Sequence, residues 1–212
     1  MTTSDFPAAT RVVLRPLATP LPLGFLALVL ATASFSAVQL GWVLPTEARV
    51  AGLTAVFATM PLQLLAAVMG FLARDPVAAT GMGVLAGTWA VVGLTTLTSP
   101  PGTTSRQLGV LLITAGLCML VPTVSAGSKL VPAAVMGLAG IRFAVTGGYQ
   151  LTGSAGWKVT AGWVGVALGL LAFYAALALE LEASHRRTIL PVGRRGPGKP
   201  AISEEPGVRP QL

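Results

Sequence analysis

One arginine, Arg142, lies in the segment MGLAGIRFAVTGG at 136–148, inside an apolar run of membrane-spanning length. A charge in the hydrocarbon core of a bilayer costs between about 2.5 and 17 kcal/mol, depending on how far the site relaxes. No Asp or Glu lies deep in any apolar run, so the expected partners are backbone carbonyls, water and a passing anion. A guanidinium grips a carboxylate through two parallel hydrogen bonds, and arginine lets anion pores exclude cations. Arg142 is therefore a candidate anion-binding residue; the alternative is a side chain that extends to the outer membrane face without a role in transport.

The remaining reactive residues give little support for catalysis or metal binding. Cys118 is the only cysteine and His185 the only histidine, which excludes an internal disulfide and a cysteine-rich metal site. Neither H-E-x-x-H nor a Walker A motif occurs. Glu180 and Glu182 stand close to His185, but a solvated helix end explains them better than an acid–base pair. We expect no enzyme, no metal and no cofactor.

The composition is that of a membrane protein that crosses the bilayer several times. Hydrophobic residues make up 53% of the chain and charged residues only 10%, against roughly 25% charged in soluble domains. Six apolar runs can each cross about 30 Å of hydrocarbon as a helix, so the predicted fold is an all-α bundle of six transmembrane helices. They cover 21–43, 50–72, 77–97, 108–126, 130–148 and 159–181.

Lysine and arginine positions predict the orientation in the membrane. Ten lie in the terminal segments and in the second–third and fourth–fifth loops, whereas Arg49, Arg106 and Lys158 lie in the other loops. The excess marks the cytoplasmic side, so both termini are expected there, in the cell membrane. The net charge of +7 is explained in the same way and not by nucleic-acid binding. We expect a cytoplasmic segment at 1–18, the membrane domain at 19–183 and a charged, disordered tail at 184–212.

Short repeats indicate how the helices could be arranged. AAVMG occurs at 66–70 and again at 133–137, which would fit two three-helix halves of opposite topology, as in many transporters, or chance recurrence. GVLAG at 83–87 and GVALG at 165–169 are small-residue motifs that let helices approach closely in lipid; background glycine frequency explains either one equally well.

Three stretches carry a resemblance to a known family: TPLPLGF at 19–25, FATMPLQLLAA with ARDPVAATG within 57–81, and AFYAALALELEASHRRTILPVG at 172–193. Together they resemble the acetate uptake transporter family, the YaaH-type succinate–acetate permeases, whose motifs are N-P-A-P-L-G-L and R-T-[VI]-L-P-I-G. The resemblance covers about residues 18 to 193. It implies a six-helix protomer assembled into hexamers, each protomer with its own pore for small carboxylates such as acetate or succinate, usually coupled to protons.

The resemblance also implies pore residues, several of which depart from the family pattern. The Phe, Tyr and Leu that narrow the pore in the family correspond to Leu28, Leu85 and about Ala139 in this chain, and a glutamate of the family corresponds to Gly70. The pore lining of this chain would therefore be wider and more aliphatic than that of the family. Arg142 shares a helix face with Ala139 because it follows three positions later. The expected pore residues are Arg142, Ala139, Leu28, Leu85, Gln63 and Gln39, and the expected cytoplasmic pore entrance is formed by Thr19, Pro20, Pro22, Leu23 and Gly24.

These observations predict a transporter or channel for small organic anions, acetate-like monocarboxylates and also succinate, in which a pore-lining Arg142 replaces the lost constriction and selects the anion. Gln39 and Gln63 could hydrogen-bond a carboxylate or equally well bridge helices. The alternative function is a transport-inactive relative that acts as a membrane interaction or scaffold protein. With no buried acid, both proton symport and passive flux remain open.

Overall fold

The computed structural model describes residues 18–185 and 187–195 and, in these ranges, every regular element is a helix. Six helices are long and apolar enough to cross a membrane, which confirms the predicted fold class. They are α1 (Leu21–Leu40), a rod of η1 (Pro45–Glu47), α2 (Ala48–Thr54), η2 (Ala55–Thr59) and α3 (Met60–Leu72), then η3 (Val77–Gly81) with α4 (Met82–Thr98), α5 (Arg106–Cys118) with α6 (Leu120–Ser125), α7 (Leu130–Thr152) and α8 (Ala155–His185).

The helix ends follow the local sequence. α1 and α7 are each followed by a glycine in the left-handed region, Gly41 with φ 73° and Gly153 with φ 66°, as expected at a helix C-terminus. Ser105 caps α5 by accepting a hydrogen bond from the Leu108 N–H. Prolines inside the spans coincide with irregular turns: the wide π-type turn of η2 ends just before Pro61, and Met119 separates α5 from α6 three residues before Pro122. A proline cannot donate the backbone hydrogen bond of a regular helix, so the helix adjusts there.

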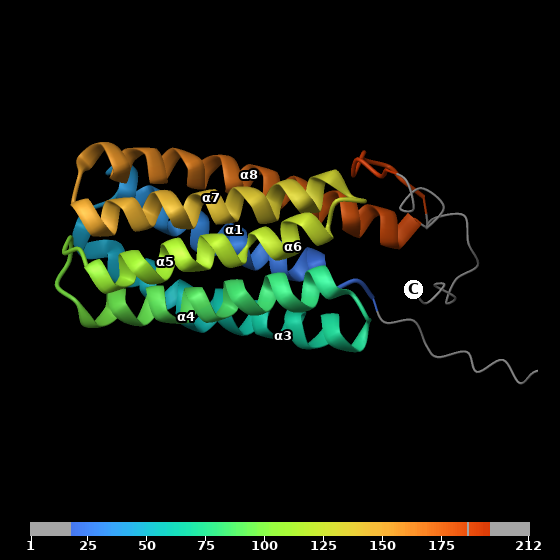
Figure 1. The fold of residues 1–212 in the computed structure, drawn as a ribbon, viewed down its shortest axis with the longest axis horizontal. Coiled ribbons are helices and arrows are strands. Elements are labelled where there is room, and N and C mark those ends of the chain that lie inside the picture. The colour runs from blue at the N-terminus through green and yellow to red at the C-terminus, as the bar shows by residue number, and fades with distance from the viewer. Residues whose placement is uncertain (1–17, 186, 196–212) are drawn as a thin grey trace, which may run out of the picture.

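The helices form a bundle in which α1 begins and α8 ends at the same end (Figure 1). We call this the terminal end, and the end carrying the loops 99–105 and 153–154 the distal end. α8 lies against both α1 and α7, and α7 also packs against α5. The α5–α7 approach depends on glycines, since a Cβ on Gly116 would lie 2.8 Å from the Gly140 carbonyl oxygen. Close backbone contact through small residues is how membrane helices associate.

The segment 187–195 corrects the expectation of a disordered tail for its first part. The Val192 side chain is buried, and the Gly193 and Val192 carbonyls accept hydrogen bonds from Leu130 N–H and Val131 N–H. These are unpaired donors of the first turn of α7, so the segment caps that helix. Glu182 of α8, itself three residues before the end of that helix, pairs with Arg194. The rest of the predicted tail, 196–212, and nearly all of the predicted N-terminal segment 1–18 lie outside the described residues. The predicted inverted repeat stays a prediction.

Candidate functional site

The Arg142 side chain is buried among three helices. Only 2% of the residue is exposed, so the side chain does not extend to the surface of the bundle. From α7 its Nη2 donates to Gln39 Oε1 of α1 at 3.1 Å, and its Nη1 donates to the Ala161 carbonyl of α8. No carboxylate pairs with it among residues 18–185 and 187–195. Its positive charge is therefore solvated by neutral oxygens alone, as expected for an arginine deep in a membrane protein.

A glycine of α8 makes the space that the guanidinium occupies. A Cβ on Gly165 would overlap with Arg142 Nη1 and Cζ and with Ser36 Oγ of α1. Gly169, one turn further along α8, has only Thr32 Cγ2 near its Cβ direction, at 3.9 Å. The motif GVALG thus contains one glycine that the site requires and one that has ordinary packing. In the other motif, GVLAG, the Cβ direction of Gly87 is open, so that glycine marks no helix contact within the bundle.

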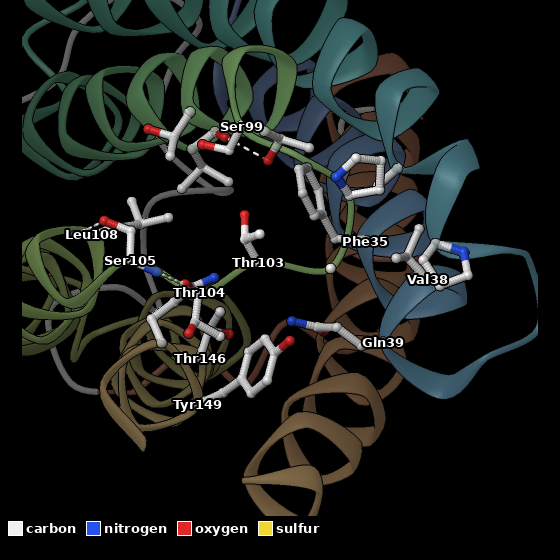
Figure 2. Close-up of a pocket in the computed structure, with 18 of the residues that line it drawn as sticks. Phe35, Val38, Gln39, Ser99, Thr103, Thr104, Ser105, Leu108, Thr146 and Tyr149 are labelled. Carbon is white, nitrogen blue, oxygen red and sulfur yellow. Dashed lines mark hydrogen bonds between the residues drawn. The ribbon is translucent and has the colours of Figure 1, made fainter. Parts of the chain in front are cut away.

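A cavity of about 370 Å³ opens at the distal end, between α1, η1, α2, α4, α5, α7 and α8 (Figure 2). Gln39 belongs to its wall, and Arg142 lies directly behind this amide. Two cationic residues, Arg49 and Lys158, contribute to the wall, and no Asp or Glu is among the lining residues. An acid-free, cationic vestibule concentrates anions, because low-dielectric walls focus the field of the charges.

A row of three aromatic rings leads from the cavity wall into the core of the bundle. Phe35, which lines the cavity, lies 5.6 Å from the Trp89 ring, and Trp89 lies 5.9 Å from the Phe143 ring. The Trp89 Nε1 is buried and has no hydrogen-bond partner in the part of the chain that the structure describes. An unpaired buried donor costs about 1–3 kcal/mol. In a conduction path such a donor would be available to an anion.

The structure brings together some of the predicted pore residues and separates others. Leu28, Leu85 and Ala139 belong to one apolar core cluster, and each is at most 1% exposed. Gln63 is also buried, and its Nε2 donates to the Gly24 carbonyl at 3.3 Å, on the side of the core toward the terminal end. Of the residues predicted to line a pore, Gln39 alone borders the distal cavity.

The predicted entrance residues lie at the start of α1. Pro20, Pro22 and Gly24 are buried, Thr19 is half-buried and Leu23 is exposed. Gly24 faces the Met82 side chain so closely that a Cβ there would displace it. The predicted glutamate position, Gly70, lies where α3 meets the following segment. A Cβ added at Gly70 would lie 2.6 Å from Ala79 N, so a glutamate would not fit there.

Comparison with known proteins shows a similarity at the level of fold. No family model matches the chain, and no curated protein does. A solved structure described as the bacterial acetate channel SatP does. It superposes with a TM-score of 0.74 at 23% sequence identity, over 84% of this chain and 99% of that chain. The chain therefore has the fold of that channel, which agrees with the family resemblance as far as fold is concerned.

Several residues of the site were not found by sequence reasoning. Arg49 and Lys158 entered only as loop charges that set the orientation, although they border the same cavity as Gln39. Tyr149 and Trp89 carried no signal, because aromatic residues in a membrane helix are equally typical of packing. The steps of four and three residues from Arg142 to Thr146 and then to Tyr149 place these side chains on one face of α7, and this spacing could have indicated Tyr149.

Proposed function

We propose that this protein is a membrane channel or transporter for small carboxylate anions of the acetate type, with succinate as a further candidate. The observation that carries the proposal is the buried Arg142 guanidinium, which has no carboxylate partner among the described residues. It lies behind a cavity whose lining residues include two cations and no acid. The fold shared with the acetate channel supports the same class of activity.

The electrostatics explain the preference for anions. Neutral oxygens from Gln39 and Ala161 satisfy only part of the donor capacity of Arg142, since a guanidinium has five N–H groups. Its field in a poorly solvated interior extends into the adjacent cavity, because screening by salt and water is weak there. A carboxylate in the cavity is stabilised by this field, and a cation is repelled.

The permeation path proposed here continues from the cavity toward the terminal end. It passes the Phe35, Trp89 and Phe143 rings, then the layer of Leu28, Leu85 and Ala139, then Gln63, and reaches the entrance formed by Thr19, Pro20, Pro22, Leu23 and Gly24. The rings are packed against one another in this structure, so conduction requires them to change rotamer.

We further propose that both termini are cytoplasmic and that the cavity faces outward. Thr103 in the distal loop is exposed, and it offers a test in a Cys118→Ala background. A cysteine placed by Thr103→Cys should react with a membrane-impermeant maleimide on intact cells. Labelling only after the cells are opened would reverse the orientation.

Assembly into homo-oligomers, with the hexamer as the expected form, is part of the proposal. Several large apolar side chains of α3 are exposed on the bundle, among them Leu64, Leu65, Val68 and Phe71, and they fit contact with lipid or with another protomer. The native mass of the detergent-solubilised protein measures the number of chains, and a monomeric mass would contradict the hexamer.

The decisive experiment is uptake of labelled acetate into proteoliposomes. Wild-type protein should give uptake that unlabelled propionate inhibits, Arg142→Met should abolish the preference for anions, and Arg142→Lys should retain part of it because the charge remains. Uptake driven by a proton gradient, compared with uptake driven by a membrane potential, separates symport from passive flux. Absence of flux in the wild-type protein would refute the proposal, and a stable protein partner in pull-downs would then favour the scaffold alternative.

A further inference from the structure

We propose that the Gln39 amide is the group that binds the substrate carboxylate at the floor of the distal cavity, and that Arg142 is a positioning residue that holds this amide in its binding orientation. This inference rests on the proposed transport function and names its binding site. It changes the role expected from the sequence, in which Arg142 itself would meet the anion.

The orientation of the amide follows from the chemistry of its neighbour. Arg142 has only donors, so the atom of Gln39 that accepts from Nη2 at 3.1 Å must be Oε1. The opposite choice would place two donors against each other, and the network excludes it. With Oε1 directed at the guanidinium, the Nε2 amino group is left to face the cavity that Gln39 lines, as Figure 2 shows.

Three threonine hydroxyl groups in the wall already donate to backbone carbonyls, so their protons are not available to a ligand. Thr96 donates to the Val92 carbonyl, Thr103 to the Pro100 carbonyl and Thr146 to the Arg142 carbonyl, each at 2.8 Å. A carboxylate requires donors. These three hydroxyls therefore cannot serve a carboxylate as donors, whereas the Gln39 amino group can.

Tyr149 supplies a second donor beside the first. Its ring borders the cavity from α7, about two turns beyond Arg142, and its hydroxyl has no hydrogen bond to the residues that the structure describes. In Figure 2 the Tyr149 and Gln39 side chains reach toward each other across the cavity. Two donors from different helices can each hold one oxygen of a carboxylate, and this arrangement suits a planar anion better than a spherical one.

The apolar part of the wall indicates which carboxylates fit. Phe35, Val92 and Leu112 line the cavity, and Phe35 of α1 also contacts Trp89 of α4. A short alkyl group would pack against these side chains while the carboxylate meets Gln39 and Tyr149. The site thus fits a small monocarboxylate such as acetate or propionate, with Arg49 and Lys158 attracting the anion to the mouth.

The test measures acetate uptake kinetics in proteoliposomes for five variants, one of which is a double substitution. Gln39→Met keeps the length of the side chain and removes the amide, so KM should rise about tenfold or more, equivalent to at least about 1.4 kcal/mol, with Vmax changed less. Arg142→Lys should keep KM within about threefold, because an ammonium also only donates and still selects Oε1. Arg142→Met should raise KM in the wild-type background and raise it much less in a Gln39→Met background, since the two residues act as a unit. Gln107→Met is the matched control, because Gln107 is exposed on α5 and lies outside the cavity wall.

Gln39→Glu gives a second, independent result if Gln39→Met does not fold. A glutamate at this position pairs with Arg142 and presents negative charge to the cavity, so acetate uptake should be lost while the purified protein keeps its thermal stability. Unchanged acetate KM in Gln39→Met or in Gln39→Glu, with the flux intact, overturns this inference and leaves the proposed function standing. Loss of flux in the wild-type protein overturns the proposed function itself, so the two failures are distinguishable.

Discussion

A methyl group added at Gly165 should disrupt the anion site from behind, without touching the cavity. In Gly165→Ala the new Cβ occupies the position of Arg142 Nη1 and Cζ and of Ser36 Oγ. The guanidinium must then leave its place between α1 and α8, because the α8 backbone is held along its length by its packing on α1 and α7. The hydrogen bonds to Gln39 and to the Ala161 carbonyl are lost together.

The size of the effect follows from these two bonds. A hydrogen bond that involves a charged group contributes about 1.5–3 kcal/mol, so losing both costs about 3–6 kcal/mol. Alanine is favoured over glycine inside a helix by about 0.8–1.0 kcal/mol, which offsets part of the loss. We therefore expect Gly165→Ala to lower the free energy of unfolding by about 2–5 kcal/mol and to abolish acetate uptake.

Gly169→Ala is the matched control, one turn along the same helix. Its Cβ would lie 3.9 Å from Thr32 Cγ2, an ordinary van der Waals distance, so the helix preference for alanine acts alone and stability should stay equal or rise by up to about 1 kcal/mol. Thermal unfolding in detergent and acetate uptake in proteoliposomes measure both variants. If Gly165→Ala is as stable and as active as Gly169→Ala, the placement of Arg142 against α8 is wrong.

Three further results are expected. Replacing Arg49 and Lys158 together by glutamine should lower acetate uptake severalfold at low ionic strength and have little effect at about 1 M salt, where the Debye length is about 3 Å; an effect independent of salt would contradict a role in attracting anions. Trp89→Phe removes a buried N–H that has no partner among the described residues, and this gain should offset part of the packing lost with the smaller ring. The melting temperature should therefore change by only a few degrees, and a larger fall would contradict an unpaired N–H. Glu182→Gln should lower stability by about 1–3 kcal/mol, between the values for exposed and buried ion pairs, because the pair with Arg194 joins the 187–195 segment to α8; unaltered thermal unfolding would show that the pair holds nothing in place.

The fold could be predicted from the sequence because a bilayer imposes a simple length rule. Six apolar runs of sufficient length gave six helices, and glycine and proline marked their ends. The prediction was too short at both ends of α8, which extends from Ala155 to His185 where the prediction began at 159 and ended at 181. Hydropathy locates the part of a helix that lies in lipid, and α8 continues beyond it into polar residues at its end.

The site was harder to predict from the sequence than the fold, because its contacts join residues that are far apart in the chain. Gln39 and Arg142 are 103 positions apart, and no local pattern connects an amide of the first span with an arginine of the fifth. Each residue stands out in the sequence by its polarity in apolar surroundings, but this polarity says nothing about which other residue it contacts. Their pairing, the space at Gly165 and the shared cavity of Arg49 and Lys158 are properties of helix packing, and one sequence does not encode them in any periodicity.

The packing also explains why Arg142 and its neighbours on α1 and α8 should be considered together. Arg142 can be buried only because Gly165 leaves it space, and its charge is tolerated only because Gln39 and Ala161 turn oxygens toward it. The hydrogen bond that Oε1 accepts from the guanidinium also fixes the orientation of the Gln39 amide, so that Nε2 faces the cavity. One hydrogen bond therefore both stabilises the buried charge and presents a donor to the cavity. Removing any one member should therefore impair the other two, whereas removing a residue of the apolar layer at Leu28 or Leu85 should change the width of the path and leave the preference for anions intact.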